Sequence, residues 1–239
     1  LYTRQVCGLF DVSHMGRLLI EGPQRKEFLQ HVLTSNVSAL DLNMAQYCII
    51  PNENGGAVDD AYLYLFQEDS YLLVVNAANI DKDLEHLNRA LSGFDCTITN
   101  ISAEWASIAV QGPKSKEMLM TLSGGESPTK EPTKNSLGTV SLEGLGARDN
   151  LRMEASFPLY GHEMGVAPDG TEIPIFAVPL AKFAVSFSAQ KGDFIGRAAL
   201  ERQHQAFIRH MDRDFSDMSA LPRRIAPIAL LDRGVMRAG

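Results

Sequence analysis

The sequence has little cysteine, a single tryptophan and no long apolar run. Its three cysteines, Cys7, Cys48 and Cys96, are odd in number and lack metal-site spacing, so we expect reduced thiols rather than a disulfide framework. No apolar stretch approaches the roughly 20 residues that a membrane span needs, so we expect no membrane partner. These absences favour a protein of the cytoplasm, or of the mitochondrial matrix in a eukaryote.

The signatures of several common activities are absent as well. The six histidines are scattered, without a His-Glu-x-x-His pair, so we expect no metal site. No phosphate-binding loop and no Gly-x-Ser-x-Gly elbow occurs. Asp11, Ser13 and His14 are near neighbours on an extended segment, where side chains point apart, which disfavours a catalytic triad. The net charge of −7, with no basic block to offset it, argues against a nucleic-acid partner.

The length of 239 residues allows one large domain or two medium ones. The chain begins with Leu-Tyr-Thr-Arg, without a methionine and without a charged-then-apolar leader. We therefore expect neither a signal peptide nor an obvious transit peptide. We also expect that an upstream segment is missing from this sequence.

One unit of sequence occurs twice. In each copy a strand ends in Gly-Pro, at Gly22-Pro23 and again at Gly112-Pro113, and apolar residues then follow at helical spacing. Pro23 is expected at the first position of its helix, where proline is favoured. The repetition predicts two related α+β halves, each with a strand, a Gly-Pro corner and a covering helix.

The most informative stretch is a turn that leads into a strand with two acidic residues. Asn54-Gly55-Gly56 is typical of a tight turn, and an alternating strand follows it. Successive side chains of a strand point to opposite faces, so we expect Asp59 and Asp60 not to share one site. A carboxylate in an apolar strand is costly unless it is partnered or used. The structural alternative is a turn acid that bonds to the Gly-Gly amides.

The remaining elements follow from periodicity and turn residues. We expect a strand over 71–75, a helix from Ile80 that stops at Gly93, and a strand over 96–101. A flexible loop is expected over 124–135, a helix or turn-helix over 145–159, a helix over 198–208 and further strands over 224–231.

Several phrases, in the same order and across nearly the whole chain, resemble the T-protein of the glycine cleavage system, a folate-binding aminomethyltransferase family. They include Gly8–Arg17, Asn54–Asp60, Leu73–Ala77, Ile108–Pro113, Gly144–Met164, Gly192–Gly196 and Asp232–Arg237. The resemblance implies an α+β fold with two intertwined strand-and-helix (ferredoxin-like) subdomains over 1–208. It also implies that 209–239 begin a C-terminal β-barrel domain that is truncated here.

The resemblance also implies an activity. Such an enzyme takes an aminomethyl group from the lipoyl arm of the H-protein and passes its carbon to tetrahydrofolate, the co-substrate. Ammonia is released and 5,10-methylenetetrahydrofolate forms. The expected partners are therefore the lipoylated H-protein and a small-molecule folate.

The resemblance assigns roles to five residues. Asp59 takes the place of the catalytic carboxylate, and Asp60 falls on the opposite face as a structural acid. Met15, Tyr47 and Asn76 match positions that line the pterin pocket, and Arg148 matches an arginine that contacts folate. Plain core packing of Met15 and Tyr47, and an ion pair of Arg148 with Asp149, remain the structural alternatives.

Some family features are missing. Thr139–Glu143 run straight into Gly144, where the family has a further stretch with a Gly-Tyr-Thr-Gly-Glu phrase that helps to hold folate. We therefore expect that segments of a longer protein are absent from this sequence. This departure keeps two alternatives open, a folate-binding relative without transferase activity that serves as an assembly or structural factor, and a folate-linked demethylase domain.

Overall fold

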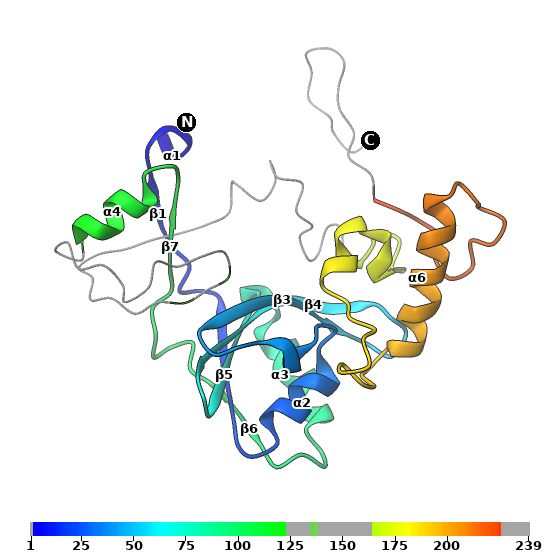
Figure 1. Cartoon of the computed structure of the whole chain (residues 1–239), viewed down its shortest axis with the longest axis horizontal. Helices are drawn as coiled ribbons and strands as arrows, with labels where there is room; N and C mark the ends of the chain where they lie inside the picture. The colour runs from blue at the N-terminus through cyan, green and yellow to red at the C-terminus, as the bar shows by residue number, and fades with distance from the viewer. Residues whose placement is uncertain (1, 123–134, 136, 138–163, 226–239) are drawn as a thin grey trace.

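The structure is a computed structural model, and it describes residues 2–122, 135, 137 and 164–225 (Figure 1). The expected helix over 145–159, Arg148 and the chain around 139–144 lie outside the described residues. So do most of the strands expected over 224–231. Within the described ranges, no helix is long and apolar enough to span a bilayer.

The centre of the molecule is a five-stranded antiparallel sheet with strand order β3-β4-β5-β2-β6. Its strands are β2 (Gly16–Glu21), β3 (Met44–Pro51), β4 (Ala57–Gln67), β5 (Ser70–Val75) and β6 (Thr97–Asn100). The strands expected over 71–75 and 96–101 are confirmed as β5 and β6. Successive side chains of each strand point to opposite faces of the sheet, so every second side chain faces the helices and the core.

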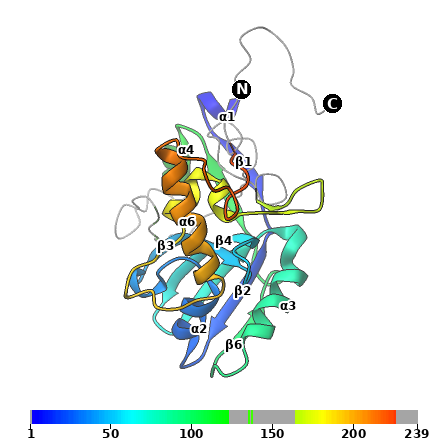
Figure 2. The ribbon, with the colours of Figure 1, turned by 90° about the vertical axis from the view of Figure 1, so that its right-hand side faces the viewer.

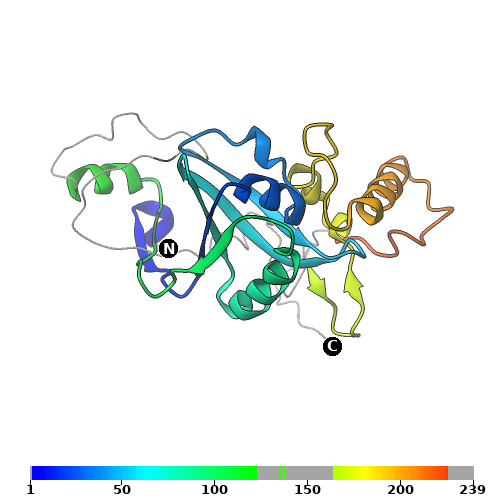
Figure 3. The same cartoon turned by 90° about the horizontal axis from the view of Figure 1, so that it is seen from below.

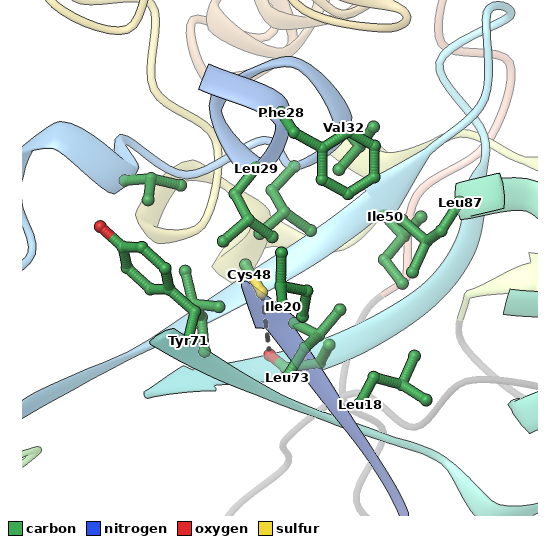
Figure 4. Close-up of a cluster of buried hydrophobic side chains, with 14 of the residues drawn as sticks. Leu18, Ile20, Phe28, Leu29, Val32, Cys48, Ile50, Tyr71, Leu73 and Leu87 are labelled. Carbon is green, nitrogen blue, oxygen red and sulfur yellow. Dashed lines mark hydrogen bonds between the residues drawn. The ribbon is translucent and has the colours of Figure 1, made fainter. Parts of the chain in front are cut away.

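Helices α2 (Arg25–Val32) and α3 (Ile80–Ala90) cover one face of this sheet. Phe28, Leu29 and Val32 of α2 and Leu87 of α3 share one apolar cluster with side chains of β2, β3, β4 and β5. Figure 4 labels those of β2, β3 and β5. Gly93 follows α3 with a positive φ of 96°, as expected for a helix stop. Two short 3₁₀-helices lie in the loops: η1 (Val37–Ala39) between α2 and β3, and η2 (Ala77–Asn79) between β5 and α3.

A second, smaller sheet joins the beginning of the chain to its middle. Strand β1 (Gly8–Asp11) pairs antiparallel with β7 (Ile108–Gln111), with Gly8 opposite Gln111. Helices α1 (Tyr2–Gln5) and α4 (Ser115–Leu122) lie beside it, at the end of the molecule away from α6 (Figure 3). The chain thus starts in one sheet, crosses to the five-stranded sheet and returns.

The repeated unit is confirmed by the backbone. Gly22 and Gly112 both have a positive φ, of 114° and 127°, and an eight-residue helix begins three residues after each. A side chain at Gly22 would meet the backbone of Cys96 at 2.7 Å, so glycine is required for space as well as for φ. The expected place of Pro23 is wrong, since α2 begins at Arg25 and Pro23 belongs to the preceding turn.

A third group of elements forms its own apolar cluster around Phe176. It comprises β8 (Gly165–Val166), β9 (Glu172–Ile173), η3 (Ile175–Ala177), η4 (Pro179–Phe183) and α6 (Arg197–Met211). Helix α6, seen along its length in Figure 2, confirms the helix expected over 198–208. It packs on η3 through Leu200, Ala206 and Phe207.

Candidate functional site

The turn before β4 is held by an asparagine, not by an acid. The Asn52 side-chain oxygen accepts hydrogen bonds from the backbone N–H groups of Asn54 and Gly56, each at 2.9 Å. Gly55 has a φ of 77°, and its carbonyl accepts a bond from Gln203 of α6 at 3.0 Å. The alternative in which an aspartate of this stretch bonds to the Gly-Gly amides is therefore wrong, and Asp59 and Asp60 have other partners.

The two acids lie in different surroundings, although both are buried, at 0% and 3% exposure. Asp59 has the same parity on β4 as Ala61 and Leu63, which face the helices. Asp60 has the parity of Tyr62, whose ring lies 6.1 Å from that of Tyr47 across the β3–β4 pair. Strand geometry thus puts Asp60, and not Asp59, on the face that carries the tyrosines.

Asn76 joins the two acids. Its side-chain nitrogen donates to Asp59 Oδ1 at 2.7 Å and lies 2.8 Å from Asp60 Oδ1. Continuing the β4–β5 register, in which Tyr62 is opposite Val74, by two residues places Asn76 beside Asp60 at the end of β5. The expectation that the two acids cannot share a site is therefore wrong, because one amide at the sheet end reaches carboxylates on both faces.

Asp59 is held by further donors. Its Oδ2 accepts the backbone N–H of Asn76 at 3.1 Å, and its Oδ1 accepts the side-chain amide of Asn79 at 3.0 Å. With the Asn76 side chain, three N–H groups therefore bond to this one carboxylate. Hydrogen bonds from N–H donors stabilise the ionised form of a buried carboxylate. All three donors come from the short segment between β5 and α3.

A third acid, Asp83 of α3, lies behind Asp59. It is fully buried, and the pKa of its carboxyl is raised to about 9, chiefly by burial. The hydrogen bond with Asp59 and the negative charge of Asp59 also contribute to this raised pKa, and the charge of Lys82 opposes them. The Lys82 amine donates to the Val58 carbonyl at 2.5 Å. Burial is also the main reason that the pKa of His86, one turn along α3, is lowered.

The structure brings most of the sequence-predicted residues together. Asp59 and Asn76 are bonded partners, and Met15 directly precedes Gly16, which pairs with Val75, so Met15 lies at the same sheet end. Tyr47 is on the opposite face from Asp59, beside Tyr62. Arg148 lies outside the described residues.

Sequence reasoning missed Asn79 and Asp83. The signal was present for Asp83, because it interrupts the apolar stripe of α3 three residues after Ile80 and four before Leu87. A carboxyl at a core position of a helix requires a partner. Asn79 lies three residues after Asn76, at the entry to that helix, and only the fold shows that both asparagines turn toward β4.

Two other candidates carry no site chemistry. The Asp11 carboxylate accepts the backbone N–H of Ser13 at 2.8 Å, and the Ser13 hydroxyl accepts the N–H of Ser107 at 3.0 Å, so these residues serve a turn and not a triad. Among the described residues, no group of three or more His, Cys, Asp or Glu side chains is arranged to hold a metal ion.

A cavity of about 330 Å³ opens beside the Asn52–Gly56 turn. It lies between that turn and α6, and its polar lining includes Asn54, Glu172, Arg202 and Gln203. Neither Asp59 nor Asp60 lines it. The pterin pocket that the family resemblance implies therefore stays a prediction.

Comparison with known proteins places this acid-bearing sheet in a family. A family model described as the GCVT N-terminal domain matches residues 1–135, more than half of the chain. The chain therefore belongs to the GCVT family, that of the glycine cleavage T-protein, as the resemblance of its motifs predicts.

The names of individual relatives are more specific than that of the family model. An aminomethyltransferase of Deinococcus deserti is 41% identical over 201 residues, which cover 67% of this chain and 56% of that protein. One of Lysinibacillus sphaericus is 35% identical over 282 residues, covering 99% of this chain and 71% of that protein. The crystal structure of the glycine cleavage system aminomethyltransferase T from Bartonella henselae matches with a TM-score of 0.69 and 26% identity, over 86% of this chain and 65% of that chain.

The lengths of these matches differ from that of the chain. The chain spans little more than half of the D. deserti protein, at 56%. The L. sphaericus match runs over 282 positions, whereas this chain has 239 residues. The relative therefore has at least 43 residues within the matched region that have no counterpart here.

Proposed function

We propose that this chain is the folate-binding part of an aminomethyltransferase of the glycine cleavage system. It would take the one-carbon unit from the aminomethyl-lipoyl arm of the H-protein and pass it to tetrahydrofolate, with release of ammonia and formation of 5,10-methylenetetrahydrofolate. The buried pair Asp59–Asp60, joined by Asn76 beside a row of tyrosines, carries the proposal. The relatives named aminomethyltransferase support it over 99% of the chain.

The chemistry of these residues fits the reaction. As ammonia leaves, the transferred carbon, still bonded to the lipoyl sulfur, becomes an electrophilic, thionium-like centre that carries positive charge. A carboxylate that is already fixed and shielded from water stabilises such a charge more strongly than one in solvent. Asp60 is 3% exposed and is bonded to Asn76 at 2.8 Å, so it meets both conditions.

We propose Asp60, in place of the Asp59 that the family resemblance implies, as the reacting carboxylate. A flat pterin ring prefers aromatic neighbours, and Tyr47, the expected pterin contact, shares its face with Asp60. Asp59 bonds to three N–H groups on the helix-covered face and serves to position Asn76. In this proposal Asp60 meets the transferred carbon, and Asp59 holds the amide that orients it.

Tetrahydrofolate, as co-substrate, supplies the amine that attacks the carbon. The residue types at the site suit it, because aromatic rings accept the pterin face and a buried acid accepts its N–H groups. Tyr47, Met15 and Asn76 would hold the pterin, and Arg148, by similarity to its family, the carboxylate-bearing tail.

The finer architecture belongs to the same proposal. We infer that residues 1–208 form two intertwined ferredoxin-like subdomains, one built on the five-stranded sheet and one on the β1–β7 sheet. Residues 209–239 would begin a β-barrel domain. The proposed partners are the lipoylated H-protein and folate, in the cytoplasm or the mitochondrial matrix.

The comparisons do not favour the alternative functions, but one observation bears on the first of them. The relative's surplus of at least 43 residues is in keeping with the missing Gly-Tyr-Thr-Gly-Glu stretch, which in the family helps to hold folate. A folate-binding relative without transferase activity, acting in assembly, is therefore the second candidate. The demethylase alternative has no such observation in its favour.

Two measurements on the purified chain test the proposal. The first is binding of tetrahydrofolate by titration, and the second is ammonia release from aminomethylated H-protein with and without tetrahydrofolate. We expect folate binding and folate-dependent ammonia release. Binding without release would support the second candidate, and absence of both would overturn the first and the second together.

A further inference from the structure

Asp83 is the one part of this acid cluster that the proposed reaction does not use. It is fully buried, and no N–H or O–H donor in the described part of the chain bonds to either of its oxygens. Its carboxyl lies within hydrogen-bonding reach of the Asp59 carboxyl. A buried carboxylate without donors would carry the full cost of its lost hydration.

The contact between the two carboxyl groups requires a proton. Two ionised carboxylates at hydrogen-bond distance repel each other and offer only acceptors, whereas one protonated group donates to the other. The donors decide which group holds the proton. Asp59 accepts three N–H bonds and is suited to the negative charge, and Asp83 accepts none.

The other groups around this pair do not supply that proton. On β4 the second acid, Asp60, bonds to Asn76. On α3 the Lys82 amine bonds to the Val58 carbonyl, and His86 hydrogen-bonds with the backbone of Pro51. On β3 the buried Cys48 thiol, whose pKa burial raises, stays neutral. The pair Asp59–Asp83 therefore shares a single negative charge.

We propose that Asp83 is a positioning residue, whose protonated carboxyl donates a hydrogen bond to Asp59 and so holds, through Asn76, the reacting carboxylate of Asp60. The link to turnover rests on the proposed function, whereas the protonated state of Asp83 does not. The series of contacts runs from α3 through the sheet to the tyrosine-bearing face. Ionisation of Asp83 would place a second charge against Asp59 and loosen the whole series.

The first test measures the proton itself. Infrared difference spectra of wild type against Asp83→Asn, recorded from pH 5 to 10, report the C=O stretch of a protonated carboxylic acid. We expect this band in wild type at pH 7, its loss near pH 9 and its absence in Asp83→Asn. Asp81→Asn, an exposed acid of the same helix, is the matched control and should keep the band. A wild-type spectrum without the band at pH 7 would overturn the proposal.

The second test measures stability against pH. An acid with a raised pKa in the folded state favours folding at low pH, and that contribution is lost as pH rises toward the folded-state value. The Tm of wild type should therefore fall relative to that of Asp83→Asn between about pH 4 and 9, while Asp81→Asn follows wild type. Parallel curves for wild type and Asp83→Asn would contradict the proposal. If Asp83→Asn does not fold, the wild-type infrared titration alone decides.

The third test connects the proton to turnover. Asp83→Asn keeps a neutral donor and should retain wild-type turnover at pH 7, whereas Asp83→Ala should lose about tenfold or more. Above pH 9 wild-type turnover should fall about tenfold per pH unit, and Asp83→Asn should lack that limb. An unchanged alkaline limb in Asp83→Asn would remove the positioning role. A wild type that shows the acid band but no ammonia release would overturn the aminomethyltransferase function and leave the proton assignment standing.

Discussion

The two faces of the five-stranded sheet treat the same residue type in different ways. On the helix-covered face, Asp59 accepts three N–H bonds and touches Asp83. On the other face, Asp60 shares the Asn76 amide and lies on the side of Tyr62 and Tyr47. Both acids are hydrogen-bonded and buried, and they differ in their neighbours: Asp59 lies on the face covered by the helices, and Asp60 lies on the face of the tyrosine rings. In the proposed mechanism, Asp59 is the positioning carboxylate and Asp60 is the reacting one.

The largest expected effect concerns the reacting face. Asp60→Asn keeps shape and removes charge, so turnover should fall about 100- to 1,000-fold while tetrahydrofolate affinity changes little. Steady-state ammonia release and a folate titration measure the two quantities. Asp59→Asn should lose less turnover and more stability. If instead Asp59→Asn abolished turnover and Asp60→Asn did not, the roles of the two faces would be reversed.

The helix-covered face should respond mainly in stability. Leu63 is fully buried on the same side as Asp59, and Leu63→Ala should lower the free energy of unfolding by about 3 kcal/mol. Urea denaturation measures this loss. Leu65→Ala, at a partly buried position on that face, should cost less. Turnover per folded molecule should be unchanged in both. A selective loss of turnover in Leu63→Ala would contradict the assignment of this face to stability and not to the reaction.

Asn76 lies between the two faces, so its replacement should affect both properties. Asn76→Ala removes donors to two buried carboxylates and should cost about 2 kcal/mol of stability together with a loss of turnover. Asn79→Ala is the matched control, because the Asn79 side chain donates to Asp59 and the Asn76 side chain to both acids. Equal losses of turnover in the two variants would show that the contact with Asp60 does not matter.

The smallest expected effect lies at the edge of the tyrosine-bearing face. The Tyr62 hydroxyl donates to Asn135 Oδ1 at 2.9 Å in a partly exposed position. Tyr62→Phe should therefore change the free energy of unfolding by only about 0.5 kcal/mol. Tetrahydrofolate affinity, followed by titration, should stay within about twofold, since the ring remains. A large loss of affinity would indicate that the hydroxyl itself contacts the ligand.

Local sequence signals predicted most of the elements, because apolar spacing and Gly-Pro corners act over a few residues. The repeat at Gly22 and Gly112 and the helix before Gly93 are examples. The relation between Asp59 and Asp60 could not be predicted in this way. Alternation along a strand correctly put them on opposite faces, but their common partner Asn76 directly follows a neighbouring strand, β5, that only tertiary pairing brings close. The same limit concealed the contact of Asp83 with Asp59.

The pairing of β1 with β7 sets an order for folding during synthesis. Gly8 cannot pair until Gln111 has been synthesised, so β1 has no partner strand until about a hundred further residues have been made. At typical translation rates this interval lasts on the order of 5 to 20 s. The sheet from β2 to β6, whose strands all lie between, is complete earlier and can form on the ribosome first. During that interval the N–H and C=O groups of β1 have no strand partner.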